Sequence, residues 1–190
     1  MLNIVLFGAP GCGKGTQAAR LKEHYGINHV STGEVIRGEI ARETELGKSM
    51  KEHIAKGMLA PDSLVIDIIE QYVLQHKSDA GNIFDGFPRT TPQAEAFDKI
   101  LEKYGLKGDL MIYMDVPEEE LVKRILLRGK DSGRADDSSE EVIRNRISTY
   151  KAQTAVVADF YSAQGKYVAV DGMGTMDEVF QRIVGAIDNL

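Results

Sequence analysis

Short apolar runs recur along the chain, separated by longer segments in which apolar and polar residues are mixed. Each run is rich in Ile, Val, Leu, Phe or Met and is bounded by Gly, Pro, Asp or Ser, which is typical of a buried β-strand. The runs that we interpret as strands are residues 2–7, 26–33, 82–85, 109–116 and 166–170.

The segments between these runs carry apolar residues at helical spacing and therefore predict helices. Residues 62–76 are apolar on almost every side, so we expect this helix to lie in the core. Residues 129–138 are polar and contain two glycines, and they are interpreted as a loop. The predicted helices begin or lie at residues 17–22, 33–40, 46–56, 62–76, 90–93, 117–128, 139–163 and 176–187.

Strands that alternate with helices predict a parallel sheet covered by helices on both faces. We therefore expect a three-layer α/β/α fold with a five-stranded parallel sheet. Residues 31–60 form a small helical insertion between a strand and the helix at 62–76, and such an insertion can swing over a cleft.

The composition is ordinary for a soluble protein, with 43% hydrophobic and 27% charged residues. The formal net charge of −6 argues against non-specific binding to nucleic acid or an anionic membrane. A single cysteine excludes an internal disulfide and suits a reducing compartment. Because no secretion signal or long apolar span is evident, we expect a cytoplasmic protein.

A glycine-dense stretch, Gly8 to Thr16, directly follows the first apolar run and precedes a helix. In this context glycines let backbone N–H groups approach a phosphate, and the helix N-terminus adds partial positive charge. Lys14 supplies a mobile charge for the outer phosphates. The alternative is a plain strand-to-helix turn with a surface lysine. Cys12, inside this loop, is interpreted either as a reactive thiolate or as a small packed thiol.

A second candidate site follows the strand at 82–85. Asp85 and Arg89 stand at the carboxyl end of that strand, where open α/β sheets bind their ligands. Planar guanidinium groups can hold phosphate oxygens bidentately and neutralise their repulsion. Other arginines of the chain are candidates for the same role, whereas Arg42, Arg144 and Arg182 are interpreted as surface residues.

The chain resembles the nucleoside monophosphate kinases, and adenylate kinases with a short lid in particular. The resemblance rests on Gly8-Ala9-Pro10-Gly11-Cys12-Gly13-Lys14-Gly15-Thr16-Gln17, Ser31 to Arg37, Asp85 to Thr90 with Gln93, Ser132 to Asp137, and Val170 to Gly174. It implies a P-loop core at 1–30, 61–127 and 139–190, an AMP-binding flap at 31–60 and a short lid at 128–138.

The resemblance also implies the reaction ATP + AMP = 2 ADP, with Mg²⁺ as cofactor, no zinc, nucleotides as small-molecule partners and a monomer. Asp85 would hold a magnesium-bound water, and Arg124 would face the transferring phosphates. The implied ATP contacts are Gly11, Cys12, Gly13, Lys14, Gly15, Thr16, Arg128 and Gly174. The implied AMP contacts are Thr32, Arg37, Met58, Leu59, Ala60, Gly86, Phe87, Pro88, Arg89, Gln93, Arg134 and Arg146. The implied catalytic residues are Lys14, Arg89, Arg124, Arg128, Arg134 and Arg146.

No catalytic base is evident, and none is required, because a phosphate monoester is largely ionised at neutral pH. The four histidines, at positions 24, 29, 53 and 76, share no metal-ligand spacing and are interpreted as surface or packing residues. Two alternatives remain at this point, a UMP/CMP kinase and a P-loop regulatory nucleotide-binding protein. The resemblance favours AMP, because relatives that act on pyrimidine nucleotides usually carry a smaller residue and an Asn at the places of Thr32 and Gln93. The chain also lacks the Asn-Lys-x-Asp motif of a GTPase.

Overall fold

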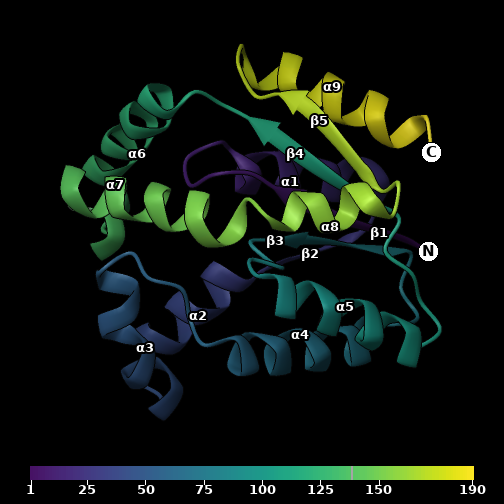
Figure 1. The fold of residues 1–190 in the computed structure, drawn as a ribbon, viewed down its shortest axis with the longest axis horizontal. Helices are drawn as coiled ribbons and strands as arrows, with labels where there is room; N and C mark the ends of the chain where they lie inside the picture. Colours follow the sequence, from purple (N-terminus) through teal and green to yellow (C-terminus); the bar gives the residue numbers. More distant parts are fainter. Residues whose placement is uncertain (138) are drawn as a thin grey trace.

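The fold is built on a parallel sheet, as the alternation of strands and helices predicts (Figure 1). The computed structural model describes residues 1–137 and 139–190, so Ser138, the last residue of the predicted lid, lies outside the described residues. Within these residues five strands pair in the order β2-β3-β1-β4-β5, and every pairing is parallel. The strands are β1 Leu2–Phe7, β2 Asn28–Ser31, β3 Gly81–Asp85, β4 Leu110–Asp115 and β5 Tyr167–Asp171.

Helices cover the sheet on two sides. Helices α1 and α9 pack against each other, whereas α5 packs against both α4 and α8. Helices α2 and α3 form a separate pair beside the sheet, and α6 packs on α7 (Figure 1). The helices are α1 Lys14–Tyr25, α2 Thr32–Ala41, α3 Glu45–Ala55, α4 Asp62–His76, α5 Thr91–Lys103, α6 Glu118–Ser132, α7 Glu140–Thr149, α8 Val157–Ala163 and α9 Met176–Asp188.

Hydroxyl side chains cap the starts of several helices, among them α2 and α5. The Ser31 hydroxyl accepts a hydrogen bond from the Glu34 amide, and the Thr90 hydroxyl accepts one from the Gln93 amide. Each bond satisfies a backbone donor that has no partner within its own helix. These caps fix the points at which the chain leaves the carboxyl ends of β2 and β3.

The prediction of a loop at 129–138 was wrong for its first four residues, because α6 continues to Ser132. A polar segment is compatible with an exposed helix, and Gly133, with φ of 62°, provides the left-handed residue that ends it. Gly129 has a different role. A Cβ atom at this position would lie 2.7 Å from the carbonyl oxygen of Asp137, so this glycine permits close packing of the chain that follows the helix.

The predicted helix at 139–163 is interrupted. Residues Tyr150–Thr154 form a π-helical turn between α7 and α8. The apolar spacing alone does not distinguish one continuous helix from two helices joined by such a turn. The expectation for residues 62–76 also needs correction, because only one face of α4 is deeply buried, through Val65, Ile69 and Val73, whereas Leu74 is 40% exposed.

The sheet topology opens a crevice next to β1. The chain leaves β1 into α1, on one side of the sheet, and leaves the neighbouring β3 into α5, on the other side. Ligands of open α/β sheets bind at such a change of direction, outside the carboxyl ends of the strands. Among the described residues, no helix combines the length and the apolar character needed to cross a membrane.

Candidate active site

A cleft of about 980 Å³ lies at the carboxyl ends of the strands. Its walls come from the glycine-rich loop, the flap at 31–60, residues 85–93, helices α6 and α7, and residues 172–176. Every predicted site residue lines this cleft except Phe87. The Phe87 ring is 1% exposed and packs edge-to-face on Phe97, with 5.3 Å between ring centroids, so its side chain belongs to the core.

The glycine-rich loop has the backbone geometry that its sequence predicts. Gly8, Gly11 and Gly13 all have positive φ, between 87° and 143°. A Cβ at Gly11 would lie 2.7 Å from the Ile125 side chain, so this position also needs a glycine for space. Helix α1 begins at Lys14, which directs its N-terminus and partial positive charge at the loop.

The Lys14 side chain lies within this loop. Its Nζ donates hydrogen bonds to the carbonyl oxygens of Gly8, at 2.7 Å, and Ala9, at 3.3 Å. It also lies 3.6 Å from the Cys12 sulfur. Cys12 is 1% exposed, and this burial supports its interpretation as a packed thiol, although its reactivity stays a prediction.

Asp85 ends β3 as a buried carboxylate, 8% exposed, facing the start of α1. Burial opposes its ionisation, but His29, Lys14 and Arg89 outweigh burial and hold the Asp85 pKa below its ordinary value. The His29 Nε2 lies 3.6 Å from the Asp85 carboxylate. The sequence interpretation of His29 as a packing residue missed this contact, which joins two neighbouring strands.

The carboxylate fits a magnesium ion held through water. In phosphate-binding sites Mg²⁺ keeps several waters and uses only one or two carboxylates together with substrate phosphates. No group of three or more metal-ligating side chains occurs in residues 1–137 and 139–190. A Cβ at Gly15 would lie 3.7 Å from the Asp85 carboxylate, which places that carboxylate beside the phosphate loop.

The turn after β3 holds Arg89 beside the flap. The Arg89 Nε donates to the Gly86 carbonyl oxygen at 2.6 Å, and the Thr32 hydroxyl donates to the same oxygen at 2.9 Å. Thr32 is the first residue of α2, so this shared acceptor joins the base of the flap to the turn that carries Arg89. Gln93 follows one turn later in α5 and is 1% exposed.

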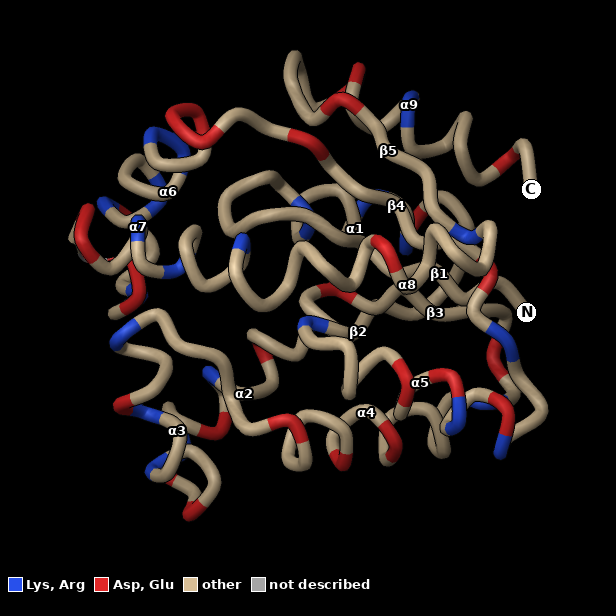
Figure 2. The backbone as a smooth tube through the Cα atoms, viewed as in Figure 1, with Lys and Arg blue, Asp and Glu red and all other residues tan. Residues whose placement is uncertain are grey.

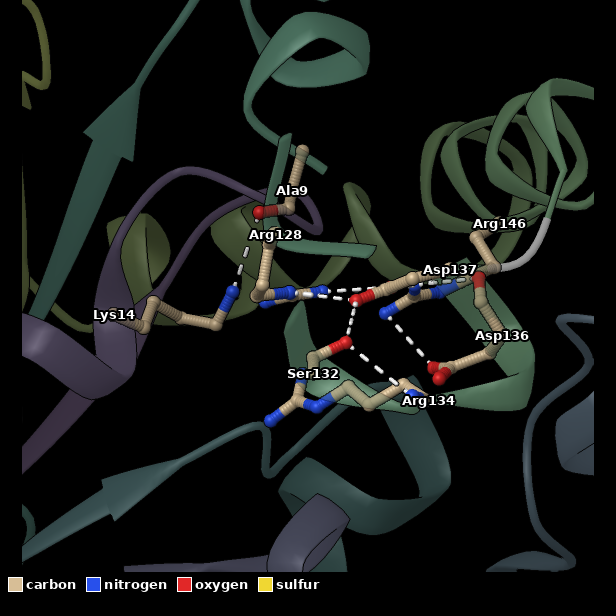
Figure 3. Close-up of polar contacts among 8 residues, drawn as sticks. All are labelled: Ala9, Lys14, Arg128, Ser132, Arg134, Asp136, Asp137 and Arg146. Atoms are coloured by element: carbon tan, nitrogen blue, oxygen red, sulfur yellow. Dashed lines mark hydrogen bonds and ion pairs between the residues drawn. The ribbon is translucent and has the colours of Figure 1, made fainter. Parts of the chain in front are cut away.

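Two arginines, Arg128 and Arg146, converge on the carboxylates of Asp136 and Asp137 (Figure 3). Arg128 binds Asp137 through two hydrogen bonds of 2.7 and 2.8 Å, and Arg146 contacts Asp137 at 2.7 Å and Asp136 at 3.1 Å. Burial opposes ionisation of Asp137, but Arg128 and Arg146 outweigh burial and lower its pKa. Arg134 lies beside this cluster, with its backbone amide on the Ser132 hydroxyl at 3.3 Å.

Positive charge is concentrated around the cleft although the chain as a whole is acidic. The basic residues that line the cleft are Lys14, Arg37, Arg89, Arg124, Arg128, Arg134 and Arg146, and Figure 2 shows the basic positions of α6 and α7 interspersed with acidic ones. Burial lowers the pKa of Arg37, Arg89 and Arg134, and neighbouring arginines lower each of them further. Such mutual repulsion favours an anion between these side chains.

Arg124 lies apart from that cluster. Its Nε donates to Glu120 at 2.8 Å, and its guanidinium lies 3.4 Å from the Gly172 carbonyl oxygen. These contacts place it beside the stretch Val170 to Gly174, which contains the implied ATP contact Gly174, and its predicted position facing the transferring phosphates stays untested. The exposed apolar residues Leu127 and Met176 flank this part of the cleft, and the sequence interpretation missed both.

The three arginines interpreted as surface residues are confirmed in that role. Arg42 pairs with Glu39, Arg144 pairs with Glu118, Glu119 and Glu140, and Arg182 donates to backbone carbonyls near Asp171. None of the three lines the cleft.

The parallel sheet, the phosphate loop between β1 and α1, and an arginine-lined cleft define a P-loop nucleotide-binding protein. A family model described as Adenylate kinase matches residues 6–166. The chain is 53% identical to an adenylate kinase of Phocaeicola vulgatus, 51% to one of Parabacteroides distasonis and 46% to one of Flavobacterium johnsoniae, and each alignment covers 100% of both chains. The chain belongs to the adenylate kinase family.

This membership confirms the fold and the family predicted from the sequence. The chain is a nucleoside monophosphate kinase that transfers a phosphoryl group between ATP and AMP, and the UMP/CMP kinase alternative is not favoured.

Proposed function

We propose that the cleft aligns MgATP on the phosphate loop with AMP beneath the flap, so that phosphoryl transfer occurs between them. The observation that carries this proposal is that one continuous cleft is lined both by the phosphate loop and by a second, separate group of arginines. A site for one nucleotide needs only the first of these features.

The donor nucleotide is assigned to the side of the cleft that the glycine-rich phosphate loop forms. Backbone amides of residues 11–16 and the N-terminus of α1 face its phosphates, and Lys14 exchanges its contacts with loop carbonyls for phosphate oxygens. Leu127 and Gly174 are assigned to the donor base, Arg124 to the transferring phosphates, and Arg128 to the donor phosphates, which it reaches from α6.

The acceptor nucleotide is assigned to the opposite side. Arg37 and Arg89 face the AMP phosphate, and Arg134 and Arg146 close over it from the lid and α7. Thr32, Gln93 and the wall formed by Met58, Leu59 and Ala60 surround the base. The backbone of Gly86 to Pro88 positions Arg89, whereas the Phe87 ring only packs in the core.

The chemistry needs alignment and charge neutralisation rather than a base. An ionised oxygen of AMP attacks the terminal phosphorus of ATP, the new P–O bond forms as the bond to the ADP oxygen breaks, and two ADP molecules result. Lys14 and the arginines stabilise the charge that spreads over the transferred group. Bound Mg²⁺, held through water by Asp85, would neutralise phosphate charge and orient the donor.

Two segments are proposed to close over the substrates, the flap at 31–60 and the lid at 128–138. The flap already approaches the lid side, because the Asn145 side chain donates to the Lys56 carbonyl oxygen, and α3 contacts the 3₁₀ turn Ala135–Asp137. Closure around both nucleotides excludes water, which could otherwise accept the phosphoryl group. A monomeric state and a cytoplasmic location stay predictions from the sequence.

The preference for AMP over CMP is assigned to Gln93. A glutamine amide can accept from the adenine amine and donate to the adjacent ring nitrogen. We expect Gln93→Ala to raise KM for AMP about tenfold, with little change in KM for ATP, because a buried amine left unpaired costs about 1–3 kcal/mol. The ratio of kcat/KM for AMP to that for CMP should fall in the same variant.

Steady-state kinetics with both acceptors at saturating ATP measure these effects. Gln164→Ala is the matched control, since Gln164 lies outside the cleft and its side-chain amide donates to Asp98. An AMP-to-CMP ratio that is unchanged by Gln93→Ala would remove the base-reading role from this residue.

A further inference from the structure

The Gln93 amide is bonded on both sides before any nucleotide is considered. Its Oε1 accepts a hydrogen bond from the Arg89 backbone N–H at 2.8 Å, and its Nε2 donates one to the Asp62 carboxylate at 2.8 Å. The Thr90 hydroxyl donates to the same Asp62 oxygen at 3.0 Å. Asp62 belongs to the first turn of α4, so these bonds join α4 to the start of α5.

These partners allow only one of the two amide orientations. An ionised carboxylate accepts hydrogen bonds but cannot donate, whereas a backbone N–H donates but cannot accept. A Gln93 amide turned by 180° would place its oxygen against the Asp62 carboxylate and its NH₂ group against the Arg89 N–H. One contact would then oppose two acceptors and the other would oppose two donors inside a buried site, and leaving buried polar groups unpaired costs free energy.

The fixed orientation of the Gln93 amide leaves one hydrogen-bond donor and one acceptor free for a ligand. After the two internal bonds, Nε2 keeps one N–H to donate and Oε1 keeps one lone pair to accept. Adenine presents an exocyclic amine that donates, beside a ring nitrogen that accepts, and therefore matches this pattern. A 6-oxopurine presents a carbonyl oxygen and a ring N–H on the same edge, which is the opposite pattern and would need the turned amide.

We infer that Asp62 is a specificity-determining positioning residue, whose carboxylate holds the Gln93 amide in the orientation that accepts adenine and rejects 6-oxopurines. This inference rests on the proposed function of Gln93 as the residue that reads the acceptor base. Asp62 itself does not line the cleft, so its effect on the nucleotide acts through Gln93.

The test compares AMP with inosine monophosphate, a nucleotide of nearly the same shape in which the 6-amino group is replaced by a carbonyl. The quantities measured are KM for AMP and the inhibition constant of inosine monophosphate against AMP, so that turnover of the inosine nucleotide is not needed. In Asp62→Ala we expect the ratio of KM for AMP to the inhibition constant of inosine monophosphate to rise about tenfold, because AMP loses affinity relative to inosine monophosphate. KM for ATP should stay within about twofold of wild type, because the donor side is untouched.

Two further variants separate amide positioning from helix stability. In Asp62→Asn the side chain keeps an acceptor oxygen, which the Thr90 hydroxyl holds toward Gln93. The ratio of the two constants in this variant should therefore lie within about threefold of the wild-type ratio. Asp177→Ala removes a carboxylate from the first turn of α9 and serves as a control for losing a helix-start charge. Thermal unfolding is recorded for each variant, and Asp62→Ser gives a second truncation if the alanine variant does not fold.

An unchanged ratio in the folded truncation variant would overturn the inference, and so would an equal change in Asp62→Asn and Asp62→Ala. These outcomes differ from failure of the proposed function. That failure would appear in the wild-type enzyme, as no ADP from AMP, or in Gln93→Ala, as an unchanged base preference.

Discussion

Replacing Lys14 with methionine is expected to lower kcat by about a hundredfold or more, the cost typical of removing one charged or hydrogen-bonding group that stabilises a transition state. The methionine side chain keeps most of the length and apolar volume of lysine but carries no charge. Lys14 lies in the phosphate loop, where its Nζ contacts the Gly8 and Ala9 carbonyl oxygens. The effect should fall mainly on kcat, since charge on the transferred group develops most in the transition state.

Lys22→Met is the matched control, because Lys22 is an exposed residue of the same helix. It should leave kcat within about twofold of wild type. Thermal unfolding of both variants separates loss of chemistry from loss of the loop contacts that Lys14 makes. A Lys14→Met enzyme with kcat within about threefold of wild type would contradict the assigned role.

Arg89→Lys is expected to lower kcat/KM for AMP at least about tenfold, equivalent to ~1.4 kcal/mol of transition-state binding. Lysine keeps the positive charge but loses the planar fork that can hold two phosphate oxygens together. It also loses the Nε–H that donates to the Gly86 carbonyl oxygen at 2.6 Å and fixes the direction of the side chain. The backbone N–H of residue 89 is unchanged, so Gln93 keeps its partner.

The control for this substitution is Arg144→Lys, because the Arg144 side chain lies outside the cleft and makes surface ion pairs with Glu118, Glu119 and Glu140. It should change kcat/KM by less than about twofold. Initial rates at varied AMP and saturating ATP measure both variants. Wild-type kinetics in Arg89→Lys would place Arg89 outside the acceptor site.

The elements that the sequence predicts well are those whose local signals agree. Residues 2–7 are apolar except Asn3, include the β-branched Ile4 and Val5, precede a glycine-rich stretch, and form β1 at the predicted position. Thr90 and Pro92 mark the start of α5 as a cap and a first-turn proline. Here side-chain chemistry and backbone preference point to the same structure.

The errors arise where spacing or composition has two structural solutions. The polar residues 129–132 suit an exposed helix as well as a loop, and contact with the chain around Asp137 extends α6 through them. Tyr150 to Thr154 keep a helical apolar pattern while forming a π-helical turn. Phe87 stands inside a site motif, but its ring has an aromatic partner in the core.

The contacts that refine the site could not be predicted, because they join segments far apart in the sequence. Asp62 meets Gln93 across 31 residues, and His29 meets Asp85 across two strands whose pairing is known only from the fold. Neither Asp62 nor His29 belongs to a motif that marks it from the sequence alone.

The most direct test of this account is the acceptor specificity of the wild-type enzyme, measured as ADP formation from ATP with AMP, CMP, UMP and GMP in turn. The account predicts rapid ADP formation with AMP, kcat/KM lower by about a hundredfold or more for the other three, and loss of activity when EDTA removes Mg²⁺. Equal or faster transfer to CMP or UMP would contradict it, and so would ATP hydrolysis that does not depend on a monophosphate acceptor.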